Sequence, residues 1–193
     1  MKSFIISDST CRTLKNREFK NYTDPSQESA SMSYHPNAEA GEIKHYLKYK
    51  LQHDCPDNLV VVAGLNDVLH HPEIKSPSGD ISQIDTIDIA NRVIDIGKDA
   101  RQAGVSRISI STLIRPKFEA GRLAVEKVNT HIKQLGRAEG FVIIDQNNIG
   151  RSDMGDAVHV NSYEGTVKLR ENIFSEFYTY RPSQPLNGRR DMG

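Results

Sequence analysis

Four polar side chains in this sequence are of the types that an ester-hydrolysing site needs. Ser9 can act as a nucleophile if a histidine takes its proton, and His159 can be that base. Asp156 stands three residues before His159, so its carboxylate can hold one imidazole nitrogen while the other nitrogen faces the serine. Asn66 carries an amide that can donate a hydrogen bond to the oxyanion, and the backbone N–H of Ser9 is a second donor. These residue types predict acyl transfer.

The places of these residues along the chain predict that they meet at one edge of a parallel sheet. Ser9 follows the apolar run at residues 4–6, which indicates a buried strand. Asn66 follows the continuous run at residues 59–63, which is typical of a central strand buried on both faces. Residues 156–159 follow the last predicted strand. Because the loops after parallel strands emerge at the same edge, we expect all three segments to lie close together there.

Predicted strands and helices alternate along the whole chain, which indicates a parallel sheet with helices on both faces. With right-handed crossovers this is a three-layer α/β/α sandwich around a flavodoxin-like parallel sheet of about five strands. We expect a single domain over residues 1–180 and a polar, disordered tail over residues 181–193. Asp80 is a good N-cap for a long helix that Gly104 ends. The predicted strands cover residues 4–6, 29–34, 59–63, 107–112 and 141–144, and the predicted helices cover residues 10–20, 38–53, 81–103, 118–136 and 162–178.

Composition and charge exclude several other functions. The 25 basic and 25 acidic residues give a formal net charge of zero, which argues against nucleic-acid binding through this domain. Cys11 and Cys55 do not make a disulfide framework, and we interpret Cys11 as a buried thiol rather than a nucleophile. No cysteine or acidic cluster accompanies His70 and His71, so we expect no metal site. Because no run reaches the roughly 18 apolar residues of a membrane span and no signal peptide precedes the first strand, we expect a cytoplasmic protein.

Three motifs, in this order, resemble the sequence blocks of the SGNH or GDSL hydrolase superfamily. Residues 7–9 read Ser-Asp-Ser and are similar to the first block, Gly-Asp-Ser. Residues 64–67 match the third block, Gly-x-Asn-Asp, and residues 156–159 match the fifth block, Asp-x-x-His. The resemblance spans nearly the whole chain. It implies an α/β esterase in which the serine, the asparagine and the aspartate–histidine pair named above are nucleophile, oxyanion donor and oriented base.

Two positions depart from the pattern of this superfamily. Ser7 replaces the glycine of the first block. Asn37 replaces the second-block glycine whose N–H joins the oxyanion hole, and Gly41 falls inside the predicted helix. Asparagine tolerates left-handed backbone geometry better than most residues and keeps its N–H. The resemblance therefore implies Asn37 as a third oxyanion donor, beside Ser9 and Asn66.

Two later segments carry a narrower resemblance. Residues 125–135 and 156–165 are similar to small esterase domains encoded by the first open reading frame of some LINE-type retrotransposons. This resemblance implies attachment to further modules.

The predicted function is hydrolysis of short-chain carboxylic esters, acetyl before long-chain. The catalytic loops are rich in serine, asparagine and glycine, and the chain has no tryptophan. We expect a small ester substrate, such as an acetylated glycan or lipid, and no cofactor. The alternative is a binding or targeting module on the same fold, within a nucleoprotein or membrane-associated assembly, whose catalysis the changes at Ser7 and Asn37 have weakened.

Overall fold

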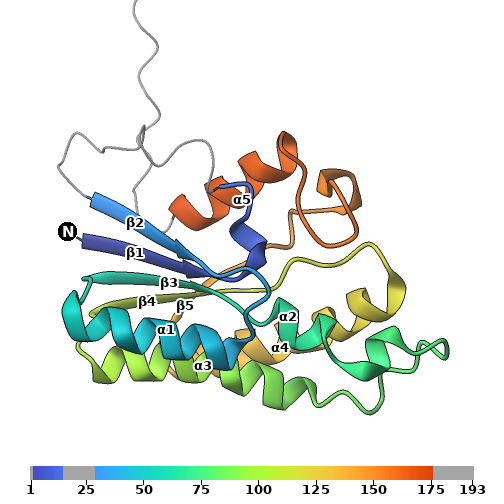
Figure 1. The fold of residues 1–193 in the computed structure, drawn as a ribbon, viewed down its shortest axis with the longest axis horizontal. Coiled ribbons are helices and arrows are strands. Elements are labelled where there is room, and N and C mark those ends of the chain that lie inside the picture. Colours follow the sequence, from blue (N-terminus) through green and yellow to red (C-terminus); the bar gives the residue numbers. More distant parts are fainter. Residues whose placement is uncertain (1, 15–28, 176–193) are drawn as a thin grey trace, which may run out of the picture.

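The computed structural model describes residues 2–14 and 29–175, and its centre is a five-stranded sheet in the order β2-β1-β3-β4-β5 (Figure 1). Every strand pair is parallel, so all strands end at one edge of the sheet. This strand order is that of a flavodoxin-like sheet, and it confirms the predicted fold class. The strands are β1 (Lys2–Ser7), β2 (Ser29–Tyr34), β3 (Asn58–Val62), β4 (Arg107–Ser111) and β5 (Val142–Ile144).

The continuous apolar runs of β1 and β3 are buried on both faces of the sheet. In β1, Phe4 and Ile6 belong to one buried cluster, whereas Ile5 belongs to a second cluster on the other face. β3 divides its residues between the same two clusters. Successive side chains of a strand point to opposite faces, so burial on both sides favours near-continuous apolar runs such as these.

Helices cover both faces of the sheet. Figure 1 shows α1, α3 and α4 on one side, and α5 on the other. The first group packs around the larger buried cluster, which includes Ile43, Val93 and Val128. α5 contributes Leu169 and Ile173 to the cluster on the opposite face. The long helices are α1 (Ala40–His53), α3 (Thr86–Gln102), α4 (Glu119–Ala138) and α5 (Glu164–Ser175), and the short ones are η1 (Ser9–Cys11), α2 (Leu65–Leu69), η2 (Pro72–Lys75) and η3 (Arg151–Asp153).

The predicted start of the long central helix is wrong. α3 begins at Thr86, and its N-cap is Asp85, whose carboxylate accepts the N–H of Asp88 at 2.9 Å. Asp80 caps only a turn, where it accepts the N–H of Ser82 at 2.8 Å. Both aspartates are good caps, and the sequence alone did not indicate which one the helix uses. Gly104 follows the end of the helix as predicted, with a left-handed φ of 100°.

Three predicted segments lie partly or wholly outside the described residues, among them the end of the helix expected over residues 162–178. The helix expected over residues 10–20 is a short 3₁₀ turn, η1, in its described part. Its remaining residues and the polar tail at 181–193 are outside that part. Within residues 2–14 and 29–175, no helix has the length and apolar character needed to cross a membrane.

Candidate functional site

Ser9 stands at the carboxyl end of β1, as the first residue of η1. Asp8 caps this turn, because its Oδ1 accepts the backbone N–H of Thr10 at 2.8 Å. The backbone N–H of Asp8 donates to the carbonyl of Val62 at 3.0 Å, which ties the turn to the end of β3. Ser9 is almost buried, with 7% of its surface exposed. The turn therefore holds the serine at the sheet edge in one fixed arrangement.

Asp8 is a buried acid beside the predicted nucleophile. Burial raises the pKa of its carboxyl to about 6, although the N–H groups of Thr10 and Leu65 lower it, and the neighbouring Asp67 raises it further. Its Oδ2 is buried and has no hydrogen-bond partner among the described residues. The Leu65 contact places this carboxyl between the serine turn and the loop that carries the predicted oxyanion donor.

Asn37 has a left-handed backbone, with φ of 62°. The loop that carries it is fixed to the serine turn, because the N–H of His35 donates to the carbonyl of Ser7 at 2.8 Å. Ala38 then closes a turn by donating to the carbonyl of His35 at 3.3 Å. The N–H of Asn37 donates to no residue that the structure describes. Asparagine thus adopts this backbone shape and leaves the N–H available.

The loop after β3 turns sharply at Gly64, which has φ of 108°. A Cβ at this position would lie 2.7 Å from Cγ2 of Val93, so both the backbone and the space require glycine. Two residues later, the amide nitrogen of Asn66 donates to the carbonyl of Ala38 at 2.9 Å. This bond uses one of the two amide N–H groups. The other remains for a ligand.

Asp67 joins the same loop to the start of α1. Its Oδ2 accepts the N–H of Ala40 at 2.8 Å. Its Oδ1 lies 3.8 Å from the guanidinium of Arg92, too far for a hydrogen bond. Burial raises the pKa of this carboxyl, against the effect of the Ala40 N–H. The loops that carry the predicted oxyanion donors Asn37 and Asn66 are therefore held together by direct bonds.

Asp156 and His159 form a hydrogen-bonded pair. Nδ1 of His159 lies 3.1 and 2.9 Å from the two carboxylate oxygens. Oδ1 of Asp156 also accepts the backbone N–H groups of Val158 and His159, at 2.8 and 2.7 Å. Burial raises the pKa of Asp156, but these N–H groups and the imidazole lower it more, to about 2. The remaining ring nitrogen, Nε2, is buried and has no hydrogen-bond partner among the residues described.

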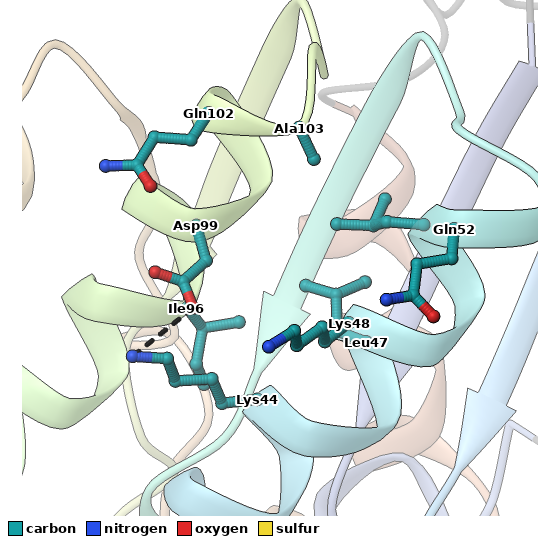
Figure 2. Close-up of a pocket in the computed structure, with 9 residues that line it drawn as sticks. Lys44, Leu47, Lys48, Gln52, Ile96, Asp99, Gln102 and Ala103 are labelled. Atoms are coloured by element: carbon teal, nitrogen blue, oxygen red, sulfur yellow. Dashed lines mark ion pairs between the residues drawn. The ribbon is translucent and has the colours of Figure 1, made fainter.

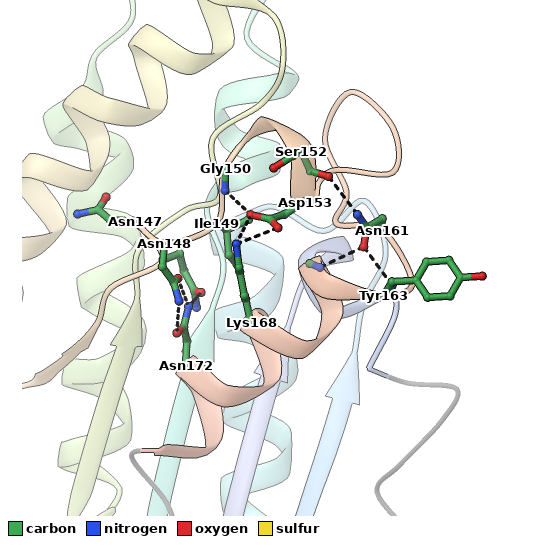
Figure 3. A network of polar contacts seen from close by, with 12 residues as sticks. Asn147, Asn148, Ile149, Gly150, Ser152, Asp153, Asn161, Tyr163, Lys168 and Asn172 are labelled. Carbon is green, nitrogen blue, oxygen red and sulfur yellow. Dashed lines mark hydrogen bonds and ion pairs between the residues drawn. The ribbon is translucent and has the colours of Figure 1, made fainter.

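A polar network shown in Figure 3 holds the loop that carries this pair. Asp153 is its centre, because its carboxylate binds Nζ of Lys168 at 2.9 Å and the N–H of Gly150 at 2.7 Å. Its carbonyl accepts the N–H of Asn161 at 2.7 Å. Gly165 at the start of α5 packs on the same carbonyl, and a Cβ there would lie 2.1 Å from that oxygen. The loop is thus fixed to α5 on both sides of the pair.

Hydrogen bonds connect several of the segments that carry predicted site residues, but the predicted contact between Ser9 and His159 is not formed. Direct bonds join the loops of Ser9, Asn37 and Asn66, and a separate bond joins Asp156 to His159. No hydrogen bond joins Ser9 Oγ to His159 Nε2. The assignment of these residues as a triad with an oxyanion hole remains a prediction.

Other candidate groups have structural roles. Burial raises the pKa of the Cys11 thiol to about 12, so it is protonated and inert at neutral pH. His70 pairs with Glu39 at 2.9 Å, and His71 caps η2 through the N–H of Glu73. In the described part of the chain, no three His, Cys, Asp or Glu side chains are grouped as a metal ion would need.

A groove of about 390 Å³ lies away from these residues, between α1 and α3 (Figure 2). Its floor is apolar, and Lys44 and Asp99 form an ion pair of 3.3 Å across it. None of the predicted catalytic residues lines it. The lining residues are Lys44, Leu47, Lys48, Leu51, Gln52, Ile96, Asp99, Gln102 and Ala103.

Several residues that shape the site were not predicted from the sequence. Asp8 lies in the Ser-Asp-Ser motif. Its position close after a buried apolar run could have indicated that its carboxyl is buried. Asp153 and Lys168 were missed because their partnership joins a loop to a helix, and neither belongs to a short motif. A sequence reveals spacing within a segment, but not which distant side chains meet.

No protein-family profile and no curated protein match the chain. Solved structures do. A lipolytic protein of the G-D-S-L family from Veillonella parvula has a TM-score of 0.70 and 15% identity, with 94% of this chain and 100% of that chain covered. The acetyl xylan esterase AlAXEase has a TM-score of 0.73 and 14% identity, covering 92% of this chain and 100% of its own. A mutant of an acetyl-xylooligosaccharide esterase from Geobacillus has a TM-score of 0.72 and 12% identity, covering 95% of this chain and 96% of its own.

These similarities confirm the predicted fold. The chain has the fold of the GDSL or SGNH esterases and lipases, a parallel sheet between two helical layers. The Ser-Asp-Ser motif stands at the end of β1, the Gly-x-Asn-Asp motif follows β3, and the Asp-x-x-His motif precedes α5.

Proposed function

We propose that the protein is a serine esterase in which Ser9 attacks the ester carbonyl. The observation that carries this proposal is the state of His159. Asp156 holds its Nδ1 at 2.9 Å, and its Nε2 is buried without a partner among the described residues. Buried polar atoms are nearly always hydrogen-bonded, so a buried ring nitrogen without a partner suits a base that receives a proton only during reaction. The likeness to solved esterases supports the same conclusion.

The proposed acylation step is nucleophilic addition followed by loss of the alcohol. Oγ of Ser9 bonds to the carbonyl carbon, its proton moves to Nε2 of His159, and the carbonyl electron pair moves to oxygen. The oxyanion accepts hydrogen bonds from the N–H groups of Ser9 and Asn37 and from the second amide N–H of Asn66. When the carbon–oxygen bond breaks, the leaving alcohol takes the proton from His159.

Deacylation repeats this sequence with water as the nucleophile. His159 takes a proton from water, the acyl–serine bond breaks, and Ser9 recovers its proton as the acid leaves. Asp156 stays ionised at neutral pH because its pKa is about 2, so it stabilises the imidazolium formed in both steps. The mechanism requires no metal ion and no organic cofactor.

An acetyl ester on a glycan is the proposed substrate. Ser9 and Thr10 are almost completely buried, which favours a small acyl group over a long chain at the nucleophile. Two of the similar structures are esterases of acetylated xylan or xylo-oligosaccharides, and the chain spans almost their full length.

Activity-based labelling tests this proposal directly. A fluorophosphonate probe is expected to label the wild type at Ser9, and Ser9→Ala is expected to lose both labelling and turnover of p-nitrophenyl acetate. The matched control is Ser33→Ala, because Oγ of Ser33 also meets a histidine, lying 2.5 Å from Nε2 of His35. This variant should keep both properties. Equal turnover by wild type and Ser9→Ala would refute the mechanism.

A binding module on the same fold, within a larger nucleoprotein or membrane-associated assembly, is the second candidate function. One observation favours it, which is that no hydrogen bond joins Ser9 Oγ to His159 Nε2. Catalytic hydrogen bonds are often long before substrate binds, so geometry alone does not decide between the two. A wild type that neither takes the probe nor cleaves p-nitrophenyl acetate would overturn the esterase proposal and favour this second candidate.

A further inference from the structure

Aromatic rings gather on the solvent-facing side of α1. Tyr46 and Tyr49 are 44% and 66% exposed, an unusual state for two large rings on one helix. Tyr46 stacks on His35, with ring centroids 4.0 Å apart and planes only 6° from parallel. Tyr49 contacts His53 at 4.5 Å. With His45, which meets Tyr46 edge-on, these five rings form what we call the α1 aromatic strip.

The α1 aromatic strip begins beside the candidate active site. His35 directly follows β2, and its N–H is bonded to the carbonyl of Ser7 in the serine turn. α1 starts at Ala40, whose N–H is bonded to Asp67 in the segment after β3, which also carries the predicted oxyanion donor Asn66. With a rise of 1.5 Å per residue, Tyr46 is about 9 Å along the helix from this start, and His53 is about 20 Å along it. A chain lying on the strip could therefore present one end to the nucleophile.

The charged side chains that flank the strip are of both signs, and two lysines of α1 form ion pairs. Lys50 pairs at 2.8 Å with Asp54, a carboxylate that Lys2 also binds, and Lys44 pairs with Asp99 at 3.3 Å. Lys48 lines the groove between α1 and α3 (Figure 2). A surface for nucleic acid needs unpaired cations to neutralise phosphates. Exposed rings flanked by acidic and basic side chains, without a cluster of unpaired cations among the described residues, suit an uncharged ligand.

From these observations we propose that the α1 aromatic strip binds the backbone of an uncharged glycan chain whose acetyl group enters the site at Ser9. Sugar rings present apolar C–H faces that pack on flat aromatic rings, while their hydroxyls stay in water. Tyr46 and Tyr49, at spacing i and i+3, lie on the same side of the helix and can support neighbouring sugars. This inference deepens the proposed esterase function and rests on it.

The test compares a polymer with a small ester. kcat/KM is measured on acetylated xylan and on p-nitrophenyl acetate for wild type, Tyr46→Ala, Tyr49→Ala and the double variant. The ratio of kcat/KM on acetylated xylan to kcat/KM on p-nitrophenyl acetate measures how much the glycan chain beyond the acetyl group contributes to turnover. We expect this ratio to fall about threefold in each single variant and about tenfold in the double variant, because each lost ring removes one stacking contact.

Two further variants separate stacking from simple apolar contact. Tyr49→Trp keeps a flat ring and should retain the wild-type ratio, whereas Tyr49→Leu keeps apolar surface without a flat ring and should not. Ile87→Ala, at an apolar residue of α3 that is 52% exposed, is the matched control and should keep the wild-type ratio. A double variant with an unchanged ratio would overturn the proposal.

Binding without turnover distinguishes this inference from the proposed function. In native gels containing deacetylated xylan, wild type should be retarded and the double variant less so, whether or not the protein hydrolyses esters. If no ester is cleaved yet retardation depends on the tyrosines, the esterase function fails and the binding surface stands. Retardation by single-stranded DNA instead of xylan, or conversion from dimer to monomer in the double variant, would assign the strip to another partner and overturn the inference.

Discussion

Asn37, a predicted oxyanion donor, has a backbone conformation that glycine adopts freely and most other residues avoid. It is the one non-glycine residue with positive φ among residues 2–14 and 29–175, at 62°. Left-handed geometry brings Cβ close to the following carbonyl oxygen, and asparagine tolerates it better than other side chains. The side chain is exposed, so it adds a polar group to the mouth of the site without displacing the core.

Substitutions at Asn37 should therefore follow backbone preference and not side-chain chemistry. Asn37→Gly is expected to keep the free energy of unfolding within about 1 kcal/mol of wild type and to keep esterase activity, because glycine adopts this φ freely. Asn37→Val should lower the free energy of unfolding by about 1–2 kcal/mol, since a β-branched residue is strained there, and should reduce kcat by displacing the N–H donor. Urea unfolding and p-nitrophenyl acetate turnover measure both. A valine variant as stable and active as the glycine variant would contradict this account.

At the residue scale, the sequence allowed one contact within the candidate site to be predicted, whereas the roles of the residues remain predictions. The Asp156–His159 bond could be predicted because three residues of spacing fix the reach of the carboxylate. The distance from Ser9 to His159 could not, because it depends on how a loop between β5 and α5 folds. Asp8 belongs to one of the motifs, but the sequence does not show that its carboxyl is completely buried and has a raised pKa.

At the scale of elements, the loop before α5 depends on an ion pair that the sequence did not indicate. The side chain of Asp153 is 1% exposed, and that of Lys168 is 38% exposed. Their bond holds the loop that carries His159 against α5 (Figure 3). Removing the cation would leave a buried carboxylate with only the N–H of Gly150 for support.

Lys168→Met is expected to lower the free energy of unfolding by about 1–2 kcal/mol, below the usual cost of breaking a fully buried pair because the lysine is partly solvated. It should also lower kcat on p-nitrophenyl acetate, since the loop that positions His159 is loosened. Lys133→Met is the control, because Lys133 pairs at 2.6 Å with Asp145, a more exposed carboxylate, and surface pairs contribute little. Urea unfolding and steady-state kinetics provide the two readouts. Equal effects of the two substitutions would show that the pair does not position the loop.

Element boundaries were predictable only where a single residue could define them. Gly104 ends α3 because a left-handed residue is needed at that point. The start of α3 was misplaced because Asp80 and Asp85 both suit an N-cap, and only the packing of the intervening turn selects Asp85. Buried Ile81 and Ile84 hold that turn against the core.

At the scale of the whole molecule, the alternation of strands and helices was enough to predict a parallel sheet with its chemistry at one edge. The sequence could not reveal how the buried charges are distributed in the folded state, because burial is a property of the assembled layers. Asp8 and Asp67 are both buried behind the sheet edge, in a protein whose formal net charge is zero. Such groups make stability depend on pH in a way that net charge does not predict.

Asp8 should make the protein less stable as pH rises. Its pKa is about 6 in the folded state against 3.8 ordinarily, so between these values the folded protein binds more protons than the unfolded chain. Its contribution to stability is complete below pH 3.8 and is lost as pH rises through 6. Asp8→Asn cannot ionise and keeps an oxygen that accepts the N–H of Thr10. The stability of the variant relative to wild type should rise between about pH 4 and about pH 7, by up to about 3 kcal/mol, and stay level above that.

Urea unfolding of both proteins across this range measures the difference. Asp80→Asn is the control, because the N–H and hydroxyl of Ser82 lower the pKa of the exposed Asp80 below its ordinary value. Asp80 therefore loses its proton at lower pH than an ordinary aspartate. The stability of Asp80→Asn relative to wild type should stay constant above about pH 5. A relative stability of Asp8→Asn that is equally constant would mean that Asp8 ionises normally in the folded protein. In that case water or a local opening of the serine turn solvates its carboxylate, and Ser9 would be less rigidly held than the hydrogen bonds of the turn indicate.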